Sequence, residues 1–249
     1  MFNGKIEINN KRIPEALLGT SPFIGAAQFG HRARLYQLDL YQKPENMVEI
    51  IKKSYELGIK GIQIIPYDNV IKAVEIAMED GCKLDIIGTV RPDKEDEDIE
   101  TFKKLEASIM LLHAVITDRW DWDYMGSFLN SIKDSGSIPG LVTHMPFKTT
   151  KKLLNSPIID LFDVYMIPVN KLGYLMDTST FMEKSRADFR ELIVKLDKTI
   201  IAKKILAAGI LNPNEALDFL KTLDYVDLVT IGIASPAEAD ETFNLLLNK

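Results

Sequence analysis

The chain has 249 residues, of which 46% are hydrophobic and 27% charged, with a formal net charge of −6 and one cysteine. This composition is typical of a globular protein, and no uninterrupted apolar stretch reaches the roughly 18 residues of a membrane span. The acidic balance gives no overall attraction to phosphate backbones, which excludes nucleic acid as an expected partner. Because Cys82 is alone and the N-terminus lacks a basic segment before an apolar core, we expect a cytoplasmic protein without a membrane partner.

Eight short apolar runs recur along the chain, and segments with helical apolar spacing, such as 47–57, separate most of them. The runs are Leu17–Thr20, Gly61–Ile65, Leu84–Thr89, Ile109–His113, Gly140–Thr143, Val164–Ile167, Thr199–Ala202 and Leu228–Ile231. This alternation predicts parallel strands covered by helices, and eight such units in about 250 residues predict a (β/α)8 TIM barrel. No linker divides the chain, so we expect a single domain over residues 1–249.

Polar residues follow these runs, at the carboxyl ends of strands where barrels of this kind carry their active sites. They are Thr20, Ser21, Gln63, Tyr67, Asp68, Thr89, Arg91, His113, Thr143, His144, Asn170, Lys171, Lys203, Lys204 and Ser235. Some of them also suit helix caps: Ser235-Pro236-Ala237-Glu238 has the sequence of a capping box. The same helix start is alternatively a site for a phosphate.

His113 ends an apolar strand, so its ring either points into the barrel mouth or finds a partner in the interior. In the mouth, a neutral imidazole donates to a substrate carbonyl and a protonated one acts as a general acid. His144 follows the next strand, which places both rings in one expected pocket. We expect no metal site, because no third ligand stands at a diagnostic spacing.

Lys203 and Lys204 are adjacent at the end of the seventh run. Adjacent strand residues point to opposite sides, so we expect only one of them to face the barrel interior. An inward lysine among apolar side chains has a lowered pKa and can form a Schiff base with a carbonyl substrate. The alternatives are a structural lysine and a clamp for an anion.

Two loop segments carry further charged side chains. His31, Arg32 and Arg34 follow the first strand, and they predict either a solvated loop or a site for a substrate carboxylate or phosphate. The segment 118–124, after the His113 strand, predicts a helix start capped by Asp118 or Asp121.

Several segments resemble the aldo/keto reductases, in the same order, along nearly the whole chain. They are Ile6–Pro14 with Leu17–Thr20 (the family's N-terminal hairpin and first strand), Gly58–Gln63 (its second strand), Ile109–His113 (the strand with the catalytic histidine), Gly140–His144 (its GVSN strand), Lys204–Gly209 (its KPLAGG segment) and Gly232–Pro236 (its last strand and helix). The resemblance implies a barrel preceded by a β-hairpin within residues 1–16.

In that family, an aspartate and a lysine adjust a tyrosine that protonates the substrate carbonyl, a histidine orients the carbonyl, and NADPH supplies hydride. Here His113 matches the histidine, whereas Gln63 stands at the place of the aspartate. Tyr67 lies one residue closer than the family spacing, and Arg91 or Val90 occupies the place of the lysine. Glutamine has no charge to pair with a lysine, and arginine stays protonated, so the set of four is incomplete.

The resemblance therefore implies an aldo/keto reductase-like protein that acts on a small carbonyl compound, with NADPH as the hydride donor. The arginines after the first strand indicate that this compound is anionic. Tyr67 would be the proton donor, His113 the carbonyl orienter and Arg91 an electrostatic aid. Candidate cofactor contacts are Ser235, Lys204 and Asn170, and candidate substrate contacts are His31, Arg32, Arg34 and His144. Two alternatives stay open: a Schiff-base lyase or aldolase that uses Lys204 or Lys203, and a barrel that only binds a metabolite or partner.

Overall fold

The computed structural model describes residues 2–248, so residues 1 and 249 of the predicted domain lie outside it. Eight parallel strands close into a barrel in the order β10-β3-β4-β5-β6-β7-β8-β9. They are β3 (Ala16–Gly19), β4 (Gly61–Ile64), β5 (Asp85–Val90), β6 (Ile109–Leu112), β7 (Ile138–Val142), β8 (Val164–Pro168), β9 (Thr199–Lys203) and β10 (Leu228–Gly232). Each strand overlaps one of the eight apolar runs, which confirms the predicted (β/α)8 barrel.

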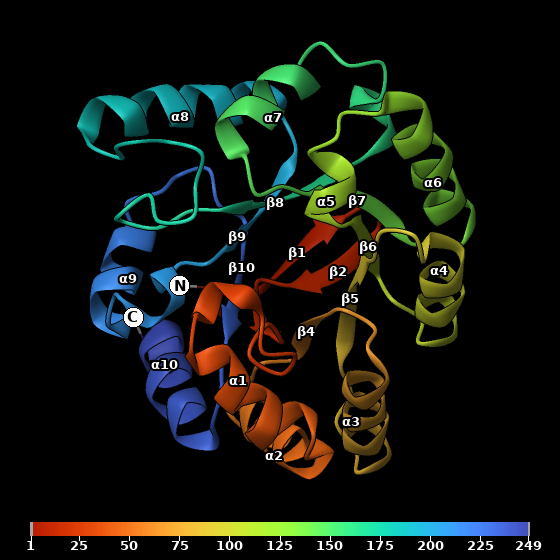
Figure 1. Cartoon of the computed structure of the whole chain (residues 1–249), viewed down its shortest axis with the longest axis vertical. Coiled ribbons are helices and arrows are strands. Elements are labelled where there is room, and N and C mark those ends of the chain that lie inside the picture. Colours follow the sequence, from red (N-terminus) through yellow and green to blue (C-terminus); the bar gives the residue numbers. More distant parts are fainter. Residues whose placement is uncertain (1, 249) are drawn as a thin grey trace.

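Helices surround the barrel on its outside (Figure 1). They are α2 (Pro44–Glu56), α3 (Asp68–Glu79), α4 (Glu95–Lys104), α6 (Trp122–Asp134), α7 (Pro146–Leu153), α8 (Glu183–Leu196), α9 (Pro213–Leu220) and α10 (Pro236–Asn248), with the short α1 (Arg32–Tyr36) and α5 (Ala114–Thr117). Gly88 of β5 lets α4 approach closely, because a Cβ there would lie 2.6 Å from the Phe102 ring. No helix in the described part of the chain is both long and apolar enough to cross a membrane.

An antiparallel hairpin of β1 (Lys5–Ile8) and β2 (Lys11–Pro14) closes one end of the barrel. It crosses the middle of the ring of strands in Figure 1. Ile8 and Ile13 of the hairpin share a buried cluster with inward-facing strand residues. The Lys11 amine donates to the Gly136 carbonyl, just before β7, at 2.7 Å. The predicted N-terminal hairpin is present, and it covers the amino ends of the strands, which leaves the carboxyl ends as the open mouth.

Candidate active site

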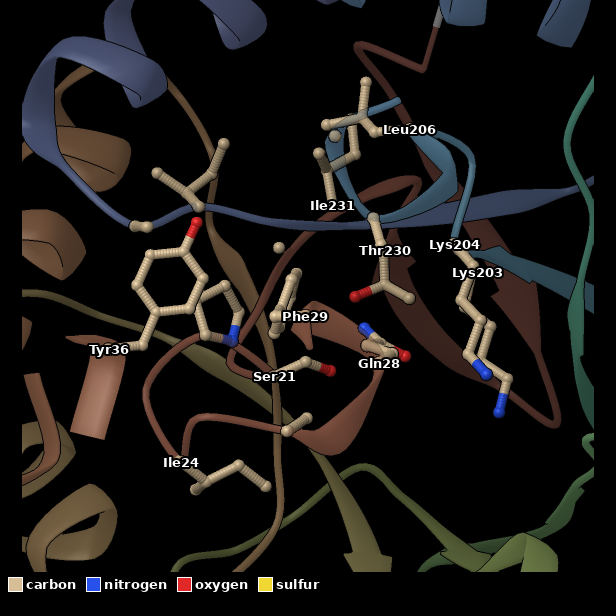
Figure 2. Close-up of a pocket in the computed structure, with 18 of the residues that line it drawn as sticks. Ser21, Ile24, Gln28, Phe29, Tyr36, Lys203, Lys204, Leu206, Thr230 and Ile231 are labelled. Atoms are coloured by element: carbon tan, nitrogen blue, oxygen red, sulfur yellow. The ribbon is translucent and has the colours of Figure 1, made fainter. Parts of the chain in front are cut away.

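A cavity of about 1250 Å³ opens at the carboxyl ends of the strands (Figure 2). Its polar lining comes from most of the strands and the loops after them, and it includes Ser21, Gln28, Arg32, Gln63, Tyr67, Thr89, His113, His144, Lys203, Lys204, Thr230, Glu238 and Glu241. Pockets for single small molecules usually have volumes of roughly 300–1,000 Å³. The cavity therefore has room for a cofactor and a small substrate together.

A neutral pair lies at the ends of β4 and β5. The Nε2 of Gln63 donates to the Oγ1 of Thr89 at 2.9 Å, and both side chains are buried. The hydroxyl of Thr20 donates to the Gln63 carbonyl at 3.0 Å, which fixes the backbone beside it. The position at which the resemblance expects an aspartate is thus bonded to a threonine, and this pair carries no charge.

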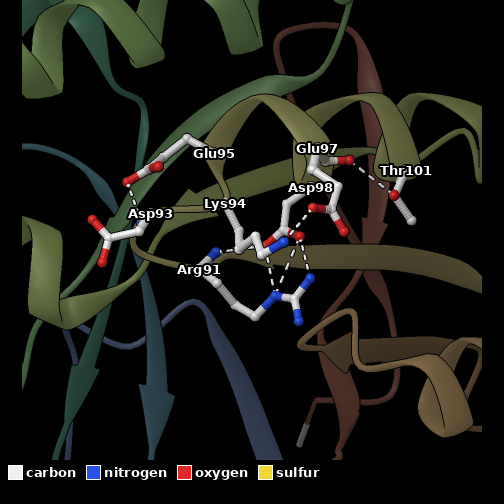
Figure 3. Close-up of polar contacts among 7 residues, drawn as sticks. All are labelled: Arg91, Asp93, Lys94, Glu95, Glu97, Asp98 and Thr101. Carbon is white, nitrogen blue, oxygen red and sulfur yellow. Dashed lines mark hydrogen bonds and ion pairs between the residues drawn. The ribbon is translucent and has the colours of Figure 1, made fainter.

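Arg91 lies outside the cavity, because α4 captures its side chain. Its guanidinium donates to both carboxylate oxygens of Asp98 at 2.6–3.2 Å, and its backbone N–H donates to the same carboxylate at 2.7 Å (Figure 3). The Asp98 carboxylate is fully buried. The guanidinium also lies 5.0 Å from the centre of the Tyr67 ring. Arg91 therefore contacts Tyr67 from outside and does not reach the cavity.

Tyr67 stands between β4 and α3 at the edge of the cavity. Its side chain is 37% exposed, and its ring meets that of Tyr41 edge to face at 6.4 Å. These two ring contacts, with Tyr41 and Arg91, hold the phenol at the mouth. The expected proton donor and the expected orienting histidine thus line one cavity.

His113 and His144 lie in this cavity with perpendicular rings whose centres are 5.9 Å apart. His113 caps α5, since its Nδ1 accepts a hydrogen bond from the Val115 N–H at 3.1 Å. An Nδ1 that accepts leaves the proton on Nε2, so Nε2–H is the donor that a ligand can meet. Burial and the charges of Lys203 and Lys204 lower the pKa of His113 to about 4 and lower the pKa of His144 too. Both rings are therefore neutral at pH 7.

The prediction that only one of the two lysines would face the interior is wrong, because both line the cavity. β9 ends at Lys203, and the backbone of Lys204 has a φ of +60°. This left-handed conformation, which is uncommon outside glycine, breaks the alternation of the strand. Figure 2 shows the two side chains running in the same direction with their amines next to each other.

The two amines share an electropositive environment. Burial lowers the pKa of Lys204 to about 8 and lowers the pKa of Lys203 well below its usual range. The charge of Lys204 lowers the pKa of Lys203 further.

Asp118 is the carboxylate whose charge raises the pKa of both lysines. It accepts hydrogen bonds from the hydroxyls of Thr143 and Thr149 and from the His144 N–H, at 2.5–2.8 Å. Asp118 thus anchors loops, and Asp121 alone caps α6 by accepting from the Tyr124 N–H.

The remaining predicted cofactor contacts serve local structure. The side chain of Asn170 donates to the Tyr174 carbonyl and accepts from the backbone N–H groups of residues 172 and 174. The Ser235 hydroxyl accepts from the Glu238 N–H, and the Glu238 carboxylate accepts from the Ala234 N–H, which completes a capping box. Neither Asn170 nor Ser235 lines the cavity, whereas Lys204 does.

Of His31, Arg32 and Arg34, only Arg32 lines the cavity. It lies beside Gly209 in the turn that follows β9, within 3.3 Å of where a Cβ would stand. Arg34 instead donates to the Gln37 side chain at 3.4 Å, and His31 lies outside the lining. One cation of this segment can therefore meet an anionic ligand in the cavity.

Sequence reasoning missed Thr230, on β10. Its hydroxyl is buried in the cavity wall and has no hydrogen-bond partner among the described residues. Buried polar groups are almost always satisfied, so this one is a candidate contact for a ligand. A threonine inside the otherwise apolar run Leu228–Ile231 was the available signal.

No protein-family model and no curated protein matches the sequence. Among solved structures, a Pseudomonas aeruginosa protein assigned to the aldo/keto reductases is similar with a TM-score of 0.65 and 15% identity, over 96% of this chain and 92% of that one. A structure assigned as a 2,5-diketo-D-gluconic acid reductase B has a TM-score of 0.61 and 13% identity, over 98% and 86%. An aspartate-to-alanine variant of Gox0644 in complex with NADPH has a TM-score of 0.62 and 13% identity, over 97% and 87%. At such identities the likeness shows the fold alone, a (β/α)8 barrel like those of these proteins.

Proposed function

We propose that this chain reduces a small anionic carbonyl compound in the cavity of the barrel mouth, with NADPH as the hydride donor. The observation that carries the proposal is that the His113 ring, neutral and with its proton on Nε2, shares one cavity with the Tyr67 phenol and a lysine ammonium. The likeness to a barrel that binds NADPH and to one named for a keto acid supports the same chemistry.

The chain's own residues divide the work. The His113 Nε2–H donates a hydrogen bond to the carbonyl oxygen and draws electron density from the carbon. The Tyr67 hydroxyl then delivers a proton to that oxygen. Lys204, whose pKa of about 8 leaves it mostly charged at pH 7, attracts the anionic group of the substrate. Because Gln63 and Thr89 form a neutral pair, they supply no charge to assist the phenol.

The cavity fits a dinucleotide by size and by charge. Its volume exceeds that of a usual single-ligand pocket, and Arg32 supplies a cation for a pyrophosphate. NADPH, when bound, would supply hydride to the carbonyl carbon. Glu238 and Glu241 of α10 line the same cavity and would repel the additional phosphate that distinguishes NADPH from NADH. Both nucleotides therefore belong in the first titration.

The proposal predicts that purified protein, stripped of nucleotide, binds NADPH. Fluorescence titration measures this directly, with NADH in parallel. Saturable binding in the micromolar range would support the reductase, and tighter binding of NADH would move the donor to NADH without changing the chemistry. A flat titration to high micromolar nucleotide would remove the reductase from consideration.

His113→Ala separates an enzyme from a barrel that only binds. Loss of a donor to the reacting oxygen is expected to lower kcat by about 10²–10⁴-fold, with nucleotide affinity nearly unchanged. His31→Ala is the matched control, because His31 is an exposed histidine outside the cavity lining. Equal rates for both variants, measured by nucleotide oxidation with a panel of keto acids and aldehydes, would contradict the assignment of His113.

A further inference from the structure

The reductase chemistry leaves one of the two amines without a role. A single ammonium, that of Lys204, suffices to attract an anionic substrate. Lys203 stands beside it on the same wall (Figure 2), and no carboxylate within the described residues forms an ion pair with either amine. Asp118, the one carboxylate that acts on them, is committed to two threonine hydroxyls and a backbone N–H. Two neighbouring amines without a counter-ion are costly unless one of them is neutral.

We propose that the Lys203 amine forms an imine with the carbonyl carbon of a small 2-oxo acid held in this cavity, a covalent chemistry that needs no dinucleotide. The inference rests on the proposed function only for the substrate class. A 2-oxo acid carries a carboxylate directly beside its carbonyl. Adjacent amines match that arrangement, because the Lys203 nitrogen reaches the carbonyl carbon while the Lys204 ammonium faces the carboxylate.

Lys203, rather than Lys204, is the nucleophile because the groups around its amine favour the uncharged form. Lys204, His113 and His144 line the same cavity, and both rings are neutral. Among the described residues, Asp118 is the only carboxylate whose charge raises the pKa of Lys203. Burial and the charge of Lys204 lower the pKa of Lys203, which favours the unprotonated amine that attacks a carbonyl. Lys204 keeps a pKa of about 8 and is therefore available as an acid near neutral pH.

The step balances with groups already in the cavity. The lone pair of the Lys203 nitrogen forms the N–C bond while the carbonyl π pair moves to oxygen, which the His113 Nε2–H stabilises by hydrogen bonding. One proton leaves the nitrogen and one reaches the oxygen through Lys204, which gives a neutral carbinolamine. The Lys204 ammonium then protonates the hydroxyl, water leaves, and the iminium forms. Neither oxidant nor reductant is consumed, and the products are one iminium and one water.

Two features of the backbone and the wall support a built site. Lys204 holds a left-handed backbone, a conformation that is strained for a residue other than glycine and that clusters at functional sites. That conformation is what brings the second amine to the cavity. The buried Thr230 hydroxyl, in the same wall and without a partner among the described residues, offers a hydrogen bond to a ligand oxygen.

Reductive trapping tests the imine. The full chain is incubated at pH 7 with pyruvate and sodium cyanoborohydride and without nucleotide, and digested peptides are mapped by mass spectrometry. We expect one adduct, on Lys203, that forms about a hundredfold faster than adducts on surface lysines such as Lys195, since an ordinary lysine is less than about one part in a thousand neutral at pH 7. Lys203→Met should abolish the fast adduct, and Lys204→Met, the matched control from the same wall, should keep it on Lys203 at a lower rate.

The wild-type peptide map stands even if a variant fails to fold. An adduct on Lys204, no adduct, or labelling at the rate of surface lysines would each overturn the proposal. Nucleotide titration of the same preparation distinguishes this failure from that of the reductase. NADPH binding without trapping overturns only the imine, whereas trapping without nucleotide binding overturns only the hydride chemistry.

Discussion

The carboxylate of Asp98 determines the direction of the Arg91 side chain, which lies against α4 and not in the cavity. Asp98 is fully buried on α4 and receives three hydrogen bonds from the guanidinium and one from the Arg91 backbone. These bonds compensate the cost of desolvating both charges. Because they also tie the end of β5 to the start of α4, the pair stabilises the loop that carries Arg91 beneath Tyr67.

Removing that carboxylate should be strongly destabilising. Asp98→Ala leaves a partly buried guanidinium and a backbone N–H without their acceptor, and we expect a loss of about 3–5 kcal/mol in the free energy of unfolding. Urea unfolding followed by circular dichroism measures it. Asp224→Ala is the matched control, because the bidentate Arg190–Asp224 pair is exposed on both sides and such pairs contribute little. Similar losses for the two variants would contradict this account of Asp98.

At the scale of elements, the sequence predicted the eight strands because each is a short apolar run. A buried parallel strand needs apolar side chains on both faces, so its signal is strong. The limits of one strand were harder to predict. β7 begins at Ile138, two residues before the predicted run, because Pro139 is a strand residue there and paired with Met110 of β6. Proline is usually excluded from strand interiors, which hid the true start.

Residues beyond the strand ends were the least predictable part of the site. Alternation places Gln63 and Thr89 inside the barrel, and this could be predicted from the strands alone. The alternation of side chains fails at Lys204, one residue after the end of β9. The backbone of Lys204 is left-handed, and no glycine marks this conformation in the sequence. The alternation also fails at Arg91, whose direction depends on a carboxylate seven residues away. Long-range partners of this kind are invisible to local patterns.

The whole molecule has two unlike ends. The hairpin plugs the amino ends of the strands with Ile8 and Ile13, whereas the carboxyl ends carry amines, imidazoles and hydroxyls. The chain as a whole has a net charge of −6, but Lys203, Lys204 and Arg32 line its mouth. Cations at the mouth give small anions a local attraction that the net charge of the chain does not provide.

The neutral imidazoles of the mouth make the stability of the fold depend on pH in a specific window. His113 has a pKa of about 4 in the folded state and about 6.5 when unfolded. Between these pH values His113 is protonated in the unfolded chain but neutral in the folded chain. The free energy of unfolding therefore decreases as the pH falls through this window. His144 acts in the same direction, and the carboxyls of Asp85 and Asp227, whose pKa values desolvation raises, act in the opposite one.

Comparison with a variant isolates the contribution of His113 from those other groups. His113→Asn removes the proton acceptor, so its stability should fall less steeply than that of the wild type between pH 6.5 and pH 4. The difference in slope should reach at most about 1.4 kcal/mol per pH unit. Urea midpoints at closely spaced pH values measure it, and His31→Asn, from outside the cavity, should follow the wild type. Parallel curves for His113→Asn and the wild type would show that the imidazole titrates alike in both states. In that case the folded protein would not favour the neutral form of His113, which the proposed hydrogen bond from Nε2–H to the carbonyl requires.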